Sequence, residues 1–172
     1  MDLPPGAEPD PTEAIGPSRF GGFRAGFVAV APLLVGVAPF GLVAGATPVA
    51  YGLGADAAVG FSVIMFAGAS QLASIEVLGA GGSVLAAVLT ACTINLRLIL
   101  YSASCSPYLR RLAPARRMVM AYLLTDEAYA LSIVRWSEQG SEAQDLPTLR
   151  GRWTFYMGAA ASMWATWQVS TL

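Results

Sequence analysis

Five apolar stretches, each close to the length of a membrane-spanning helix, dominate this 172-residue chain. A helix needs about 20 apolar residues to cross a bilayer, and backbone polar groups in lipid must be satisfied internally, so the stretches favour packed helices. The stretches run from Arg24 to Pro48, from Ala57 to Leu78, from Val84 to Ser106, from Met118 to Trp136, and from Trp153 to Leu172. The sequence therefore predicts an all-α, polytopic helical membrane protein whose transmembrane domain covers residues 19–172.

The composition supports a membrane setting and excludes several classes of partner. Hydrophobic residues make up 55% of the chain and charged residues only 12%, whereas an ordinary soluble domain has about 25% charged residues. The formal net charge of −1 gives no basic surface for nucleic acid, so we expect no nucleic-acid partner. Residues 1–18 are rich in proline, glycine and acids and lack the features of a signal peptide. They are predicted to form a disordered cytoplasmic tail.

The first apolar stretch carries three prolines and three interspersed glycines, which predict an interrupted helix. The segment from Ala38 to Gly41 is the expected position of the break. In a bilayer, interrupted backbone is tolerated where it is buried in protein or lines a cavity, and broken helices often build transporter sites. Pro39, Phe40 and Gly41 are therefore candidate substrate-binding residues. The alternative is a proline kink that affects packing alone.

The distribution of arginines in the loops gives a second reason to expect an irregular stretch. If all five stretches cross the membrane, the arginines divide five against four between the two sides. If one of the first three stretches is re-entrant, the division becomes six against three, which agrees better with the positive-inside rule. Either the proline-rich first stretch or the segment from Gly68 to Gln71 is expected to turn back.

An arginine lies in the middle of the third stretch, and two acids lie in the middle of the fourth. Placing Arg97 at a bilayer centre costs roughly 2.5–3.5 kcal/mol, so such a residue normally faces a polar interior and has a partner. Asp126 or Glu127 lies at a similar depth, and we expect one of them within about 4 Å of Arg97. If the stretch is one helix, Tyr122, Asp126 and Tyr129 share one face, and Glu127 is turned about 100° away.

These residues resemble a known family when they are taken in order along the chain. The matching segments are Ala38-Pro39-Phe40-Gly41 with Gly45, Phe66 to Gln71, Asn95-Leu96-Arg97 with Leu100-Tyr101-Ser102, Leu124 to Glu127, and Trp164 with Trp167-Gln168. The pattern resembles the AzlC-type permeases, the azaleucine-resistance family implicated in export of branched-chain amino acids. This resemblance implies a multi-pass protein of the bacterial inner membrane that acts with a small AzlD-type membrane partner. The family commonly has His after Asn-Leu-Arg, where this chain has Leu98, and is usually longer, so the chain is expected to be truncated at its C-terminus.

A branched-chain amino acid is a zwitterion with an apolar tail, and the candidate residues match its parts. Arg97 offers a bidentate fork for a carboxylate, and Asp126 or Glu127 could receive the ammonium or take up a proton. Asn95 and Gln71 are further candidate binding residues, although each could instead only join helices by hydrogen bonds.

The sequence thus predicts a permease subunit for hydrophobic amino acids, with no enzyme activity and no cofactor. The alternative is a structural subunit or truncated remnant in which Arg97 and the acids only hold helices together. A membrane hydrolase is disfavoured because Asp126 and Glu127 diverge on one helix, which is a poor arrangement for carboxylates that share a substrate.

Overall fold

The structure, a computed structural model, describes residues 22–172, and the predicted tail of residues 1–18 lies outside this range. The described residues form seven α-helices and one short 3-10 helix, with no strand among them, which confirms the all-α class. The elements are α1 (Phe23–Ala50), α2 (Ala55–Met65), α3 (Gly68–Gly79), α4 (Val84–Cys105), η1 (Ser106–Leu109), α5 (Pro114–Tyr122), α6 (Asp126–Gln139) and α7 (Leu146–Thr171).

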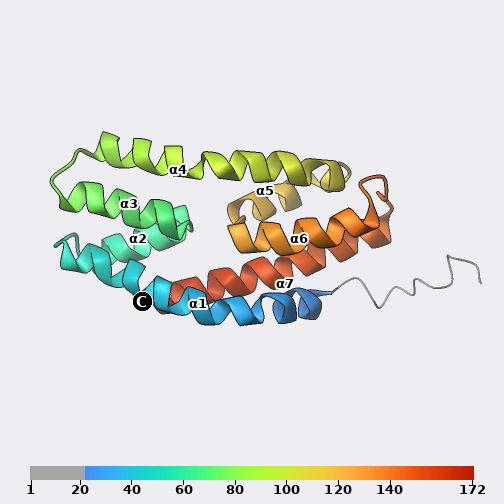
Figure 1. The fold of residues 1–172 in the computed structure, drawn as a ribbon, viewed down its shortest axis with the longest axis horizontal. Helices are drawn as coiled ribbons and strands as arrows, with labels where there is room; N and C mark the ends of the chain where they lie inside the picture. The colour runs from blue at the N-terminus through green and yellow to red at the C-terminus, as the bar shows by residue number, and fades with distance from the viewer. Residues whose placement is uncertain (1–21) are drawn as a thin grey trace, which may run out of the picture.

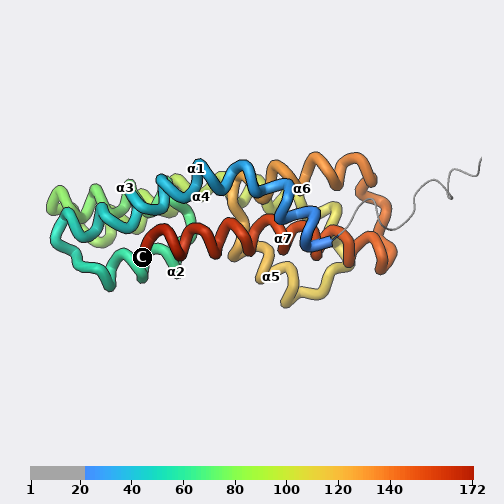
Figure 2. The backbone as a smooth tube through the Cα atoms, turned by 90° about the horizontal axis from the view of Figure 1, so that it is seen from below, coloured from blue at the N-terminus to red at the C-terminus, as the bar shows by residue number. Residues whose placement is uncertain are grey.

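Long helices and short helical hairpins alternate along the chain. Helices α1, α4 and α7 lie along the long axis of the molecule, and the pairs α2–α3 and α5–α6 enter from opposite ends and turn back near its middle (Figures 1 and 2). Of the described helices, α1 and the continuous segment from α4 through η1 are long and apolar enough to cross a membrane by length and composition. Five separate spans are not confirmed, because the second and fourth apolar stretches each divide into two short helices.

The first six helices form two units of opposite direction. In Figure 1, α1 runs from right to left and is followed by the α2–α3 hairpin, whereas α4 runs from left to right and is followed by the α5–α6 hairpin. Figure 2 shows the same arrangement from a perpendicular direction. Paired units of inverted direction, with broken helices meeting between them, are a recurring architecture of secondary transporters.

The predicted break at Pro39 is wrong, because α1 is continuous from Phe23 to Ala50 with all three prolines inside it. Its glycines instead permit close packing against α7. A Cβ atom at Gly41 would collide with Ser170, and a Cβ at Gly45 would collide with the backbone of Thr171. Small residues of this kind allow membrane helices to approach closely, so packing against α7 supports a continuous α1 where proline alone would weaken it.

The chain breaks instead at two other places. Phe66, between α2 and α3, has the left-handed φ of 36° and is the single non-glycine residue with positive φ in the described range. This agrees with one of the two alternatives that the sequence left open, in which the segment from Gly68 to Gln71 and not the first stretch turns back. The second break, at Leu123 to Thr125, was not predicted, and it places Tyr122 and Tyr129 on different helices, so the expected shared face is wrong. Thr125 caps the new helix by accepting a hydrogen bond from the Ala128 amide, with two acids in its first turn.

Side chains satisfy carbonyl groups that the two breaks leave without helical partners. At the end of α2, the Ser62 carbonyl accepts from Gln168 Nε2 at 3.2 Å and the Val63 carbonyl accepts from the Tyr122 hydroxyl at 2.6 Å. At the end of α5, the Met120 carbonyl accepts from the Tyr156 hydroxyl at 2.7 Å. Helix α7 therefore supports both hairpins, because it carries Gln168 as well as Tyr156.

Arginines concentrate at one end of the molecule, which we call the basic end. It comprises the start of α1, the segment from η1 to α5, and the connection from α6 to α7, which lie together in Figure 1. Its arginines are Arg24, Arg110, Arg111, Arg116, Arg117, Arg135, Arg150 and Arg152. Arg152 is buried there and donates to Gln139 Oε1 and to the carbonyls of Tyr108, Gly140 and Ala143. Within the described residues, Arg97 is the one arginine outside this end.

Candidate functional site

A cavity of about 140 Å³ lies where the tips of the two hairpins approach each other. Five helices and both breaks contribute to its wall, so residues far apart in the sequence meet here. The lining residues are Val37, Phe40, Phe66, Ala67, Gly68, Ala69, Arg97, Leu98, Leu124, Thr125, Asp126, Glu127, Met163 and Trp167. We call this space the central pocket.

The predicted pair of Arg97 and a carboxylate is confirmed. Arg97 Nη1 donates to Asp126 Oδ2 at 2.6 Å, and the two side chains retain 35% and 41% of their surface exposed. Asp126 receives this bond because it begins α6 directly after the second break, where its carboxylate faces α4. Glu127 also lines the central pocket and reaches a second groove between α1 and α6. The pocket therefore holds two carboxylates and one guanidinium.

Three polar atoms of the lining residues are buried and have no hydrogen-bond partner within the described part of the chain. They are Arg97 Nε, Asp126 Oδ1 and Trp167 Nε1. A buried polar group without a partner costs about 1–3 kcal/mol, so three such atoms on residues of the pocket wall are unfavourable as they stand. Two of the atoms are donors and one is an acceptor, which is the complement of a molecule carrying both a carboxylate and an ammonium.

The two hairpin tips present opposite charge to the pocket. Helix α3 begins at Gly68 and has no side-chain cap, so its first amides carry the partial positive charge of a helix N-terminus. Helix α6 begins with a capped N-terminus and carries Asp126 and Glu127 in its first turn. One tip can therefore attract an anionic group, and the other can attract a cationic group.

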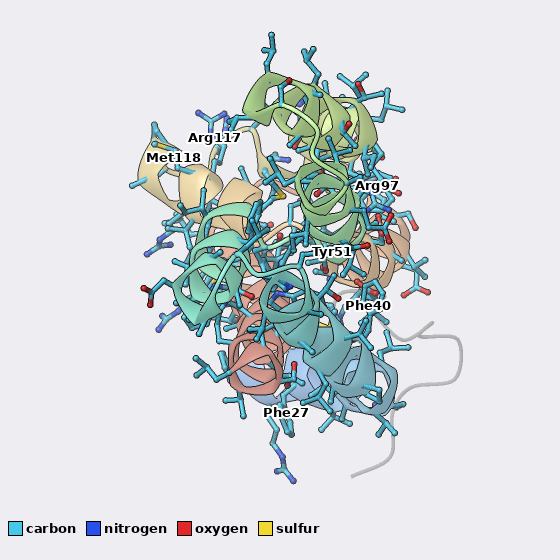
Figure 3. All side chains as sticks on the ribbon, turned by 90° about the vertical axis from the view of Figure 1, so that its left-hand side faces the viewer. Phe27, Phe40, Tyr51, Arg97, Arg117 and Met118 are labelled. Atoms are coloured by element: carbon cyan, nitrogen blue, oxygen red, sulfur yellow. The ribbon has the colours of Figure 1, made fainter. Side chains whose placement is uncertain are left out.

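The remaining wall of the central pocket is apolar. The rings of Phe40 from α1 and Trp167 from α7 lie 5.7 Å apart and are tilted by 58°. Met163 and Leu98 extend this wall, and Leu98 stands at the position where the resemblance leads us to expect histidine. Figure 3 shows Phe40 and Arg97 on the same side of the molecule, on different helices. A charged part and an apolar part thus share one cavity.

The other predicted site residues lie outside this cavity. Gln71 is fully buried within the first hairpin, where its Nε2 lies 3.5 Å from Ser62 Oγ. Asn95 is partly buried on α4 and does not line the pocket. Pro39 is exposed and Gly41 packs against Ser170, so Phe40 is the one residue of that trio in the pocket wall.

Sequence reasoning missed the contribution of α7 to the site. Trp167 and Met163 line the pocket, and neither was identified as a pocket residue from the sequence. The sequence signal for Thr125 was available, because Thr followed by Asp and Glu is a typical helix start. Trp167 carries no comparable local signal, since its position depends on the packing of α7 against α1.

Comparison of the sequence with known proteins identifies a family. The model of the AzlC protein family matches residues 32–172. The chain is 29% identical over 149 residues to the inner membrane protein YgaZ of Escherichia coli K12, an alignment that covers 82% of this chain and 55% of YgaZ. The chain thus spans about half the length of that relative. No solved structure matches it. The match over most of its length places the chain in the AzlC family of membrane transport proteins.

Proposed function

We propose that the chain is a permease subunit of the bacterial inner membrane that exports branched-chain or other hydrophobic amino acids. One observation carries this proposal: three residues with unpaired buried polar atoms, Arg97 (Nε), Trp167 (Nε1) and Asp126 (Oδ1), line a cavity that also has an apolar wall. A zwitterionic amino acid supplies an acceptor for the two donors and a donor for the acceptor. Its aliphatic side chain fits the apolar part.

The charges of the pocket favour one orientation of the substrate. The carboxylate is bound by Arg97 and by the first amides of α3, where a helix N-terminus favours an anion. The ammonium is bound by Asp126, with Glu127 beside it. Because Asp126 already accepts a bond from Arg97, the substrate would insert between the two side chains or beside their contact.

The opposed hairpins suggest how the pocket could open to each side of the membrane in turn. By the positive-inside rule, the basic end faces the cytoplasm. Hairpin α5–α6 then separates the central pocket from the cytoplasm, and hairpin α2–α3 separates it from the other side (Figure 1). Movement of one hairpin at a time would expose the site alternately, as inverted units do in other transporters.

The partly exposed Arg97 and Asp126, which would lie near the middle of the membrane, support the presence of a partner subunit. Arg97 and Asp126 keep more than a third of their side-chain surface uncovered, in a region that would otherwise meet lipid. A charged pair in contact with hydrocarbon is unfavourable, so a small AzlD-type membrane protein covering this flank would stabilise it. We propose that the exporting unit contains both proteins.

The alternative is that the Arg97–Asp126 pair only joins α4 to α6. The short contact between the two side chains favours this alternative, because each side chain already gives the other a hydrogen-bond partner of opposite charge. Arg97→Lys separates the two functions. It keeps the charge near Asp126 but removes the planar fork that binds a carboxylate.

The test measures efflux of leucine, isoleucine and valine from cells that produce the protein with its small partner. Arg97→Lys and Asp126→Asn should each reduce efflux by at least about tenfold at matched membrane abundance, since charge-assisted bonds contribute roughly 1.5–3 kcal/mol. Glu76→Gln is the matched control, because Glu76 is exposed near the far end of α3. Equal efflux from wild-type and Arg97→Lys proteins would favour the structural alternative.

A further inference from the structure

The apolar part of the central pocket has a defined limit on size. We propose that Phe40 and Trp167, held in place by Gly68, form a selectivity wall that admits aliphatic side chains and excludes aromatic ones. The inference rests on the proposed function, since it concerns the same site, and it assigns the choice between substrates to the two rings of the apolar wall.

The wall is built from three segments that the sequence keeps far apart. Trp167 belongs to α7 and is 5% exposed, so its ring is held by the core. Phe40 belongs to α1 and is 42% exposed, so one side of its ring faces the pocket and the other faces the flank of the molecule. The tilted rings of Phe40 and Trp167 pack next to Gly68, the first residue of α3.

Gly68 fixes the position of both rings. A Cβ atom at this residue would lie 2.5 Å from Phe40 Cε1 and 2.6 Å from Trp167 Cη2, closer than packed carbon atoms approach. Any side chain at position 68 must therefore displace the rings into the cavity or move the hairpin tip away from them. Gly68 also begins α3, the helix whose first amides would bind the substrate carboxylate. The same residue therefore affects both the space left for the substrate side chain and the binding of its carboxylate.

The volume of the cavity matches an aliphatic amino acid better than an aromatic one. A cavity of roughly 150 Å³ in another protein accommodates a molecule the size of benzene. The central pocket, at about 140 Å³, must hold a carboxylate and an ammonium as well as a side chain. A four-carbon side chain takes up less of the remaining space than a benzyl group, which would have to occupy the place of the Phe40 ring.

The experiment measures equilibrium binding of leucine and phenylalanine to the purified protein with its partner in lipid nanodiscs. Phe40→Ala should raise the affinity for phenylalanine relative to leucine by at least about tenfold, the range that a change of this size in an apolar pocket produces. Gly68→Ala should weaken leucine binding more than alanine binding, because it narrows the same wall. Phe27→Ala is the control, since Phe27 lies on α1 but points away from the bundle (Figure 3).

The outcomes separate the wall from the proposed function. If the wild-type protein is folded and binds neither leucine nor valine, the proposed function is overturned and the wall with it. If leucine binds but its preference over phenylalanine is unchanged in Phe40→Ala, the wall alone is overturned. Phe40→Leu keeps an apolar side chain in the packed position and should shift the preference in the same direction, so a folding defect of the alanine variant does not decide the result.

Discussion

The two hairpins have the same architecture and opposite chemistry. Hairpin α2–α3 turns through Phe66, whose backbone is left-handed, and leaves the N-terminus of α3 without a side-chain cap. Hairpin α5–α6 starts at the basic end with Arg116 and Arg117 and turns into a helix that is capped by Thr125 and begins with two acids. One tip offers unpaired amides, and the other offers carboxylates.

Under the proposed function, this difference would allow two units of inverted direction to bind a substrate with opposite charges at its two ends. Two identical tips would present the same partial charge to the pocket and would favour a ligand with like charges at both ends. A capped, acidic tip facing an uncapped one creates a local dipole across the cavity instead. A zwitterion aligned with that dipole is stabilised at both ends.

The largest expected effect concerns which segments share a side of the membrane. In a variant without Cys92 and Cys105, single cysteines at Leu53 and Ala80 should react with an impermeant thiol reagent from one side only. Ala113→Cys should react only from the other side, because each hairpin returns to the end at which it entered. Labelling of Leu53→Cys and Ala80→Cys from opposite sides would show that α2 and α3 cross the membrane, and the comparison of hairpins would fail.

Next in size is the loss of a buried hydrogen bond at the second hairpin. Tyr156→Phe leaves the Met120 carbonyl at the end of α5 without its partner in a buried position, which should destabilise the protein by about 1–3 kcal/mol. Unfolding in mixed micelles measures this change. Tyr51→Phe is the control, because Tyr51 is 47% exposed in the α1–α2 connection. Equal stability of the two variants would mean that this bond does not support the hairpin.

Removing the N-terminal cap of α6 and adding one to α3 tests the electrostatic difference between the two hairpin tips. Thr125→Ala removes the cap of α6 and should cost about 1 kcal/mol. Ala67→Ser places a hydroxyl at the N-cap of α3, where it would bond the amides proposed for the substrate carboxylate. It should therefore stabilise the first hairpin slightly and weaken leucine binding. Stronger leucine binding by Ala67→Ser would argue that these amides do not bind the carboxylate.

The smallest expected effect is at the contact between the hairpins. Tyr122→Phe removes the bond to the Val63 carbonyl and the bond that Trp164 Nε1 donates to the hydroxyl, and cross-helix bonds in membranes contribute about 0.6 kcal/mol each on average. Stability should change little, but hydrogen exchange at the end of α2 should become faster. Unchanged exchange there would show that the two hairpins are held together by packing alone.

Sequence reasoning gave the helical class and the Arg97–Asp126 contact, because a charge in an apolar stretch requires a partner at the same depth. It placed the break at Pro39, where the local signal was strongest, although packing of α1 against α7 keeps that helix continuous. The break before Thr125 had a local signal that was outweighed by the apolar length of the stretch. Trp167 could not be assigned to the site, since three helices must be assembled before it reaches Gly68.

Helix α7 satisfies a broken end of both hairpins, and this has a consequence for the order in which they can move. If a hairpin swings away as in the proposed transport cycle, its carbonyl leaves Gln168 or Tyr156 and needs a new hydrogen-bond donor. Water supplies that donor only on the side that is opening, because the opposite side remains dry. If both hairpins opened at once, Gln168 and Tyr156 would have to release the carbonyls at the ends of α2 and α5 before water reached either one. Hydration of the pocket and release of a cap are thus linked events, and a leak through the whole membrane is disfavoured by the same helix that holds the site together.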